Sequence, residues 1–464
     1  MKETTIDNPL GTHNIGVLML RFAVPTIVSN LVNASYNLVD QIIIGNSVGM
    51  LGIAATNVAF PLTTISAATA YLLGPGGGSR FSISLGRGDK EAANRYACNT
   101  LSILVILGTI IAIGVLLFAK KLVMAFGSTD TVQPLALTYT RIIAIGIPFG
   151  IFTTGASSII RADGSPRYSM WCTLVGALFN IVGDPLAVFV FGWGIAGVAW
   201  ATTISQILTA ALSINYFLRK SRDIAVKKAY LRPDFRLARD IMALGLTPCI
   251  NQLGATILQI TLNNTLRHYG ALSIYGSDIP LSCVGAISKL GVIFTSITVG
   301  IAQGGQPILG FNYGAGMYGR VKKTLRDAVI AATSVSVLAF LVFQIFPRPL
   351  MLLFGEDDPL YLEFGVHYLR TFMFMIFLSG VQPVAATFFP AIGKATRGLW
   401  ISLSRQVIFI IPLLLILPRF FGLDGAVYSG PASDFGAALI SASLIFAEVR
   451  KMPQGRRIIN DNGG

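Results

Sequence analysis

Residues 101–119 read LSILVILGTIIAIGVLLFA, a stretch without a single charged side chain. A helix needs about 20 predominantly apolar residues to cross the hydrocarbon core of a bilayer. Comparable, predominantly apolar runs occur at residues 329–346 and 401–417. These runs predict helices that span a membrane, and they exclude a soluble globular fold.

The composition of the whole chain agrees with this interpretation. Of its 464 residues, 53% are hydrophobic and only 12% are charged, and the mean hydropathy is +0.68. Soluble domains usually carry about 25% charged residues. Residues 1–16 lack the basic region, the short apolar stretch and the small-residue cleavage site of a signal peptide. The apolar run that begins at Phe22 is therefore expected to remain as a membrane helix.

Twelve apolar segments can be separated along the chain. They lie near residues 22–44, 51–78, 97–118, 133–158, 168–190, 195–217, 241–266, 281–304, 328–346, 365–390, 399–418 and 425–447. Each is long enough to form a membrane-spanning helix. The sequence therefore predicts an all-α membrane protein with twelve transmembrane helices.

The positive charge of the chain is distributed unevenly among the connections. The formal net charge is +14 and the pI is near 9.8. Alternate connections hold most of the lysines and arginines, around residues 80–95, 161–167, 219–239, 320–326, 394–397 and 450–457. Cytoplasmic loops of membrane proteins carry this excess, so we predict a multi-pass protein of the cell (inner or plasma) membrane with both termini in the cytoplasm. We expect the basic loops to contact anionic lipid headgroups and no nucleic acid.

The two halves of the sequence resemble each other. Pro25 and Pro248 occupy the same place early in the first and seventh helices, and glycines recur at an offset of 228 residues: Gly77 and Gly305, Gly88 and Gly316, Gly197 and Gly425. Each half has an even number of helices, so both halves share one orientation. A pseudo-two-fold axis then runs along the membrane normal, with a substrate site between the halves. We predict an N-terminal six-helix lobe at 1–218, a basic cytoplasmic linker at 219–240 and a C-terminal six-helix lobe at 241–464.

Acidic residues inside the first-half helices are candidate functional groups. An ionisable side chain within a span costs about 2.5–3.5 kcal/mol on insertion, so it is a functional candidate by default. Asp40 lies four residues after Tyr36. Asp184 likewise lies four residues after Asn180, so each acid shares a helix face with its partner. At 1.5 Å per residue, Asp40 and Asp184 lie about 28 Å and about 25 Å from the basic cytoplasmic ends of their helices.

These depths place both acids in the outer half of the bilayer. Thr202 falls there too, about 12 Å inward of the preceding external turn. A candidate site is therefore formed by Asp40, Asn180, Asp184 and Thr202. Its oxygen ligands suit a hard cation or a proton, and we predict a Na⁺ site if the protein is sodium-coupled. Two alternatives stay open, with Asp40 as an interfacial residue and Asp184 as the partner of Arg141.

The second half carries different ionisable residues. Asn263 stands where the first half has Asp40. Lys289 or Arg405 is expected to form a structural ion pair with Asp434, and a substrate-contacting or gating role is the alternative. Aromatic, methionine and polar residues are expected to line a cavity for lipophilic cations. This set comprises Tyr36, Asn37, Tyr139, Phe149, Phe152, Met170, Phe179, Gln259, Asn263, Lys289 and Arg405.

Several motifs follow one another along the chain. They are Tyr36-Asn37-Leu38-Val39-Asp40, Gly86-Arg87-Gly88-Asp89, Asn180-Ile181-Val182-Gly183-Asp184-Pro185, Gln303-Gly304-Gly305-Gln306-Pro307 and Asn312-Tyr313-Gly314-Ala315. Over nearly its full length the chain resembles the MATE (multidrug and toxic compound extrusion) family, and within it the bacterial multidrug-efflux branch. The resemblance implies a V-shaped pair of six-helix lobes and alternating access driven by Na⁺ or H⁺.

The resemblance also implies residue roles. It places a first-lobe ion site at Asp40, Asn180, Asp184 and Thr202, with Tyr36 and Tyr139 nearby. Some relatives have a coupling acid on the seventh helix, where this chain has Asn263, so coupling through the second lobe is not expected here. We expect a cation-coupled antiporter that exports lipophilic, cationic organic compounds. It would act as a monomer, with no cofactor besides the coupling ion.

Three other functional classes agree less well with the sequence. A flippase for a lipid-linked or amphiphilic precursor would use the same two lobes, and Lys289 and Arg405 keep that alternative open. A membrane-embedded enzyme would need a clustered nucleophile, metal site or acid pair. The sequence offers none, and its three histidines are dispersed. A passive channel is also less suitable, because two six-helix lobes suit alternating access better than they suit a symmetric pore.

Overall fold

The computed structural model describes residues 8–353 and 358–453. Every regular element within these ranges is a helix. Eleven of the described helices are long and apolar enough to cross a membrane, and one bent pair brings the number to twelve. The predicted all-α membrane fold with twelve spans is therefore confirmed. The predicted cytoplasmic termini and part of the last basic cluster, residues 1–7 and 454–464, lie outside the described residues.

The spans follow each other in chain order. In the first half they are α2 (Ile15–Ser47), α3 (Met50–Gly86), α4 (Lys90–Ala125), α5 (Gln133–Ala162), α6 (Pro166–Pro185) and α7 (Gly194–Asn215). In the second half they are α8 (Phe235–Ala271), α9 (Asp278–Gly314), α10 (Tyr318–Ile345), the pair α12 (Pro359–Phe372) and α13 (Val381–Ala391), the composite of α14 (Ala395–Leu403) and α15 (Ile411–Ile416), and α17 (Leu423–Lys451). Short α-helices α1 (Pro9–Thr12), α11 (Pro347–Leu352) and α16 (Pro418–Phe421) lie before or between these spans.

The helices extend beyond the apolar segments that predicted them, and aspartates cap the N-terminal ends of α4 and α8. The side chain of Asp89 accepts a hydrogen bond of 2.9 Å from the backbone N–H of Ala92 and so starts α4. Asp234 accepts a bond of 2.8 Å from the N–H of Arg236 and starts α8. An aspartate at this position satisfies a backbone donor that the first helical turn leaves free.

The tenth span is bent, where the sequence predicted a single helix at 365–390. The pair is bent by 41° at the break before α13. A Cβ atom at Gly380 would lie 2.6 Å from the carbonyl oxygen of Ala332 on α10, so only glycine allows the chain to pass this close to the neighbouring backbone. Pro383 follows in the first turn of α13, where its missing N–H breaks no helical hydrogen bond.

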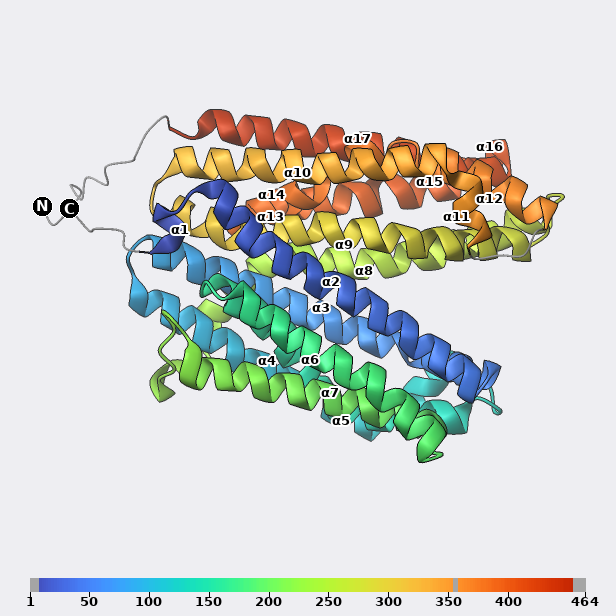
Figure 1. Cartoon of the computed structure of the whole chain (residues 1–464), viewed down its shortest axis with the longest axis horizontal. Helices are drawn as coiled ribbons and strands as arrows, with labels where there is room; N and C mark the ends of the chain where they lie inside the picture. The colour runs from blue at the N-terminus through green and yellow to red at the C-terminus, as the bar shows by residue number, and fades with distance from the viewer. Residues whose placement is uncertain (1–7, 354–357, 454–464) are drawn as a thin grey trace, which may run out of the picture.

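The spans form two groups, α2–α7 and α8–α17 (Figure 1). The groups lie against each other near the start of α2 and diverge toward the end at which α2 finishes (Figure 1). The helices that meet between them are chiefly α3 with α8, and α2 and α3 with α9. This arrangement is the two-lobe fold that the sequence repeat predicted. The exact lobe and linker boundaries at 1–218, 219–240 and 241–464 stay a prediction.

Glycines allow the two lobes to approach each other at backbone distance. A Cβ atom at Gly304 of α9 would lie 2.6 Å from the Cα of Ala23 on α2. Added Cβ atoms at Gly245 of α8 and Gly86 of α3 would likewise overlap backbone oxygens of the opposite lobe. Small residues permit this kind of close helix packing inside a membrane. The Gln306 side chain adds hydrogen bonds of 3.0 Å to the Pro75 carbonyl and 2.8 Å to the Ser79 hydroxyl.

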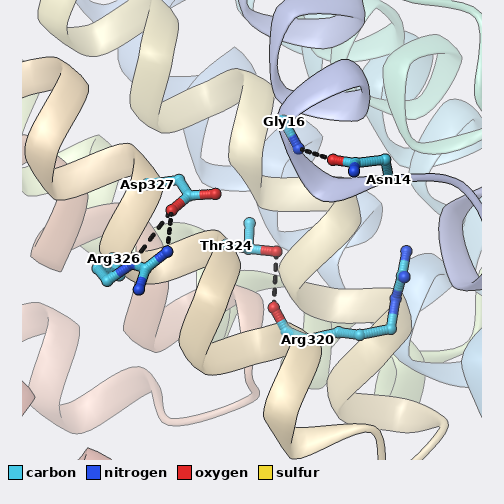
Figure 2. A network of polar contacts seen from close by, with 6 residues as sticks. All are labelled: Asn14, Gly16, Arg320, Thr324, Arg326 and Asp327. Atoms are coloured by element: carbon cyan, nitrogen blue, oxygen red, sulfur yellow. Dashed lines mark hydrogen bonds and ion pairs between the residues drawn. The ribbon is translucent and has the colours of Figure 1, made fainter.

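The start of the chain is fastened to the second lobe by Arg320 of α10. Its guanidinium donates hydrogen bonds of 3.1 Å to the Leu10 carbonyl and 2.7 Å to the His13 carbonyl. The Asn14 side chain then accepts a bond of 2.9 Å from the Gly16 N–H and caps α2 (Figure 2). The entry into the first lobe is thus held against α10 at the end where the lobes touch.

Candidate ion and solute site

The structure brings together the four residues that the sequence proposed as an ion site. Asn180 donates hydrogen bonds of 3.2 Å to Asp184 Oδ1 and 3.2 Å to the Thr202 hydroxyl. Asp40 of α2 lies close enough to Asp184 of α6 for the two carboxyl groups to interact electrostatically. The site is deeply enclosed, since Asp184 is fully buried and Asn180 is 2% exposed.

The local sequence explains why these side chains meet. Asn180 and Asp184 are separated by one helical turn, so both project from the same face of α6. Pro185 ends α6 and is followed by a π-helical turn, Leu186–Val190. Gly183 helps α6 to approach α7, because a Cβ atom there would lie only 3.3 Å from the Ala201 side chain. This approach places Thr202 beside Asn180.

Three oxygen atoms of this cluster have no hydrogen-bond partner among the residues that the structure describes. They are Asp40 Oδ1, Asn180 Oδ1 and Asp184 Oδ2, and all three are buried. A buried polar atom without a partner is costly, typically by about 1–3 kcal/mol. Buried acceptor oxygens without a donor suit a hard cation, and the carboxylates also fit a proton.

No basic side chain neutralises these acids among the described residues. Arg141 is exposed, and the ion pairs found within the described ranges do not include Asp40, Asp184 or Arg141. The alternative pairing of Asp184 with Arg141 is therefore not present in the structure. Asp40 is 9% exposed, which differs from the alternative of an interfacial residue.

Two tyrosines border the acidic pair. Tyr139 of α5 is 7% exposed and lies within electrostatic range of both Asp40 and Asp184. Tyr36, one turn before Asp40 on α2, also lies within range of Asp40. Both hydroxyl groups are potential hydrogen-bond donors to a carboxylate. A change in the charge of the acids would therefore alter the interactions of α5 as well as those of α2 and α6.

A polar cavity of about 330 Å³ opens next to the acidic cluster. It lies mostly inside the first lobe, between α2, α3, α5, α6 and α7, and Gln303 of α9 adds one side chain from the second lobe. Tyr36, Asn37 and Asn180 line it near the cluster, and Arg161 lines it as well. Most of the other lining groups are hydroxyls and amides. A cavity of this size and character can hold a small organic molecule.

The other expected first-lobe residues lie outside this lining. Phe152 is buried within the main hydrophobic core, and Phe149 packs against that core. Met170 is half-buried, and Phe179 is 38% exposed. Of the first-lobe residues expected to contact solute, Tyr36 and Asn37 line the cavity.

The second-lobe residues are also placed elsewhere. Gln259 and Asn263 are exposed on α8, where Gln259 donates a 3.0 Å hydrogen bond to Asn263. Lys289 is exposed on α9. Arg405 donates a 2.8 Å bond to Asp434, which is 5% exposed, so the expected structural ion pair is confirmed with Arg405 as the basic partner.

The Arg405–Asp434 pair gives a stability prediction. We expect Asp434→Asn to lower the free energy of unfolding by about 1–3 kcal/mol, because it leaves a half-buried guanidinium without its counter-charge. Combining it with Arg405→Gln should recover part of that loss. A double-mutant cycle by thermal unfolding in detergent checks this, with the exposed pair Arg95–Glu91 as the control, expected to contribute below about 0.5 kcal/mol. Additive effects of the two changes would contradict the pairing.

Sequence reasoning missed several residues of the cavity. Asn33, Tyr71, Gln206 and Gln303 line it and were not expected there. In the sequence, Arg161 belongs to the basic cluster at residues 161–167, which predicts only a cytoplasmic helix end. It is in fact 8% exposed and lines the cavity, because α5 continues to Ala162 and keeps Arg161 within its last turn. Polar residues at one-turn spacing along α2, α5 and α7 were the available signal.

Two six-helix lobes that span a membrane around an internal polar cavity are an architecture suited to a membrane transporter. The MatE family model matches residues 25–186 and 254–416, once in each half of the chain. The chain therefore belongs to the MatE family. The two matches begin 229 residues apart, which agrees with the internal repeat seen in the sequence.

Individual relatives resemble the chain over nearly its whole length. The multidrug export protein MepA of Staphylococcus aureus is 24% identical over 428 residues, which cover 92% of this chain and 93% of that protein. MepA of Staphylococcus saprophyticus is 23% identical with the same coverage. The solved outward-facing conformation of a multidrug resistance MATE family transporter of the MOP superfamily superposes with a TM-score of 0.89. It covers 97% of this chain and 99% of its own, at 21% identity.

Proposed function

We propose that this protein is a cation-coupled antiporter that exports lipophilic, cationic organic compounds by alternating access. The observation that carries this proposal is the set of three buried acceptor oxygens without partners, next to a solute-sized polar cavity. The names of the relatives, which are multidrug export proteins, support it. The coupling ion is Na⁺ or H⁺, and no other cofactor is required.

The proposed site residues have separate roles. Asp40 and Asp184 supply the charge that holds the ion, and the Asn180 and Thr202 oxygens complete the ligand set. With no ion bound, two ionised carboxylates repel each other across α2 and α6. Binding of a cation or proton removes this repulsion and lets the two helices pack together, which changes the shape of the adjoining cavity. The bound solute is then released to the outside.

The placement in the membrane completes the proposal. The basic connections lie on the cytoplasmic side of the inner or plasma membrane, where they contact anionic lipids, and both termini are cytoplasmic. The functional unit is a monomer with an N-terminal lobe at 1–218, a linker at 219–240 and a C-terminal lobe at 241–464. No nucleic acid takes part.

Transport in proteoliposomes tests the proposal and identifies the ion. A lipophilic cationic dye should leave the vesicle lumen against its own gradient when an inward gradient of the coupling ion is imposed. Sodium coupling predicts that an Na⁺ gradient at equal pH drives this movement, and proton coupling predicts that a pH gradient without Na⁺ does so. The same vesicles with both gradients collapsed are the control. Dye movement that ignores both gradients would contradict a cation-coupled antiporter.

One observation favours a flippase as a second candidate. A cavity of about 390 Å³ lies along α14 and α17, lined by Arg397 and by the exposed side chains of Trp400 and Leu439. A basic group beside apolar residues suits the headgroup and acyl chain of an amphiphile. Movement of a fluorescent phospholipid between leaflets, measured by dithionite quenching, would support the flippase if it stopped in Arg397→Ala and continued without any ion gradient.

A further inference from the structure

Arg161 is a buried cation with neutral neighbours only. Its Nη1 donates a 2.6 Å hydrogen bond to the Ser157 hydroxyl, and its Nη2 donates a 3.0 Å bond to the Ser158 hydroxyl. The Ser157 hydroxyl is shared with Ser169 of α6 at 2.7 Å, so this group joins α5 to α6. No carboxylate within the described ranges lies at ion-pairing distance from the Arg161 guanidinium.

Two other buried charges, outside the acidic cluster, are compensated. Glu448 is 2% exposed and pairs with both Lys394 and Arg397. Asp163 is 2% exposed and accepts hydrogen bonds from the Tyr216 hydroxyl and from two backbone N–H groups. Burying a charge is expensive unless it is paired and hydrogen-bonded. A guanidinium has five N–H donors, and two serine hydroxyls leave most of them for another partner.

The free side of Arg161 belongs to the solute cavity. Arg161 lines this cavity together with Ser157, Ser158 and Tyr71, and Asn180 lines it beside the acidic cluster. Along α6, Ser169 and Asn180 are eleven residues apart, about 16 Å at 1.5 Å per residue. The cavity thus has Arg161 at one end and Asn180, beside the buried acidic cluster, at the other, separated by roughly the length of a drug-sized molecule.

We propose that Arg161 binds the anionic group of the exported solute, so that the cavity accepts zwitterionic or carboxylate-bearing amphiphiles and not only simple cations. The inference rests on the proposed function, because it requires that this cavity receive the solute. A carboxylate is the group expected there, since its two oxygens match the parallel N–H donors of a guanidinium. The cationic part of the same molecule then lies toward the other end of the cavity, near the buried acidic cluster.

The test compares two dyes that differ in one charge. A rhodamine with a free carboxylate is zwitterionic, whereas its ethyl ester carries only the positive charge. Binding is measured by fluorescence polarisation with the full chain in phosphatidylcholine nanodiscs. The wild-type protein should bind the carboxylate dye about tenfold more tightly than the ester. Arg161→Gln should weaken binding of the carboxylate dye about tenfold more than binding of the ester. Arg161→Lys should have an intermediate effect, because lysine keeps the positive charge but lacks the parallel N–H donors of the guanidinium.

Arg141→Gln is the matched control. It changes an arginine on the same helix that is exposed and does not line the cavity, so the ratio of the two affinities should match that of the wild type. An unchanged affinity ratio in Arg161→Gln would overturn the inference. Failure of the wild type to bind or export either dye would instead contradict the proposed function, so the two failures are distinguishable.

A measurement on the wild-type chain removes any dependence on the folding of variants. Phenylglyoxal modifies accessible arginines, and the carboxylate dye should protect Arg161 from it, as read by mass spectrometry, while the ester should not. Equal protection by both dyes would overturn the inference. Repeating the binding with phosphatidylglycerol in the nanodiscs identifies the source of the anion. Competition by this lipid that disappears in Arg161→Gln would assign the same anion site to a lipid phosphate.

Discussion

Asp184→Asn is expected to reduce gradient-driven export by at least about a hundredfold while the protein still folds. The substitution keeps the shape of the side chain, and its amide oxygen can still accept the hydrogen bond that Asn180 donates at 3.2 Å. It removes one of the two charges that hold the ion. Asp184 is fully buried, and losing a buried carboxylate without a basic partner removes a desolvation cost. The thermal unfolding temperature should therefore stay the same or rise slightly.

The measurement is dye export from proteoliposomes under an imposed Na⁺ or pH gradient, alongside thermal unfolding in detergent. Asp130→Asn is the matched control, because it removes an exposed carboxylate of the same lobe. It should export at the wild-type rate. Export by Asp184→Asn at that rate, still driven by the gradient, would remove the acidic cluster as the coupling site. Loss of export with a large fall in the unfolding temperature would indicate a structural role for Asp184 instead.

Gly304→Leu is expected to lower export at least about tenfold, although Gly304 contacts neither the acids nor the cavity. The glycine lets α9 lie on the backbone of α2, and a Cβ atom there would approach the Ala23 Cα to 2.6 Å. Overpacking of this kind typically costs about 1–3 kcal/mol. A cost of 1.4 kcal/mol that applies only when the lobes are joined at this end would shift the balance of the two conformations about tenfold.

Accessibility of the cavity shows which conformation is lost. A cysteine in place of Asn33, which lines the cavity, should react with a membrane-impermeant maleimide from the outer side in the wild type and from the cytoplasmic side in Gly304→Leu. Gly285→Leu is the matched control, since Gly285 lies on the same helix with nothing within 4 Å of an added Cβ atom. Unchanged export and unchanged labelling in Gly304→Leu would contradict a closure of the lobes at this contact.

The sequence predicted the parts of this molecule that depend on local periodicity and on depth in the bilayer. Apolar length sufficed for the twelve spans, and one-turn spacing sufficed to place Asn180 beside Asp184. The distance from the basic helix ends placed Asp40 at a similar depth, and the structure puts the two acids within reach of each other. Span length and one-turn spacing can be read from a single helix. The similar depth of the two acids requires only that both helices be measured from the same membrane surface.

Features that depend on contacts between distant segments could not be predicted in this way. The bend before α13 lies where Gly380 passes close to Ala332 on α10. Phe152 was expected in the cavity but belongs to the core, because an aromatic residue on a membrane helix has the same local pattern in either place. The Ser157 hydroxyl that accepts a hydrogen bond from Arg161 also contacts Ser169 of α6, which lies beside it only in the folded lobe.

The position of Arg161 in the cavity wall has an electrical consequence. A cargo with one positive and one negative group carries no net charge outward, so a single inward cation leaves each transport cycle electrogenic. Moving one elementary charge across 100 mV supplies about 2.3 kcal/mol, which sustains a cargo gradient of roughly fiftyfold. A purely monocationic cargo exchanged one for one would gain nothing from the membrane voltage. The polarity of the pocket would then decide which solutes the cell expels by voltage and which by ion concentration alone.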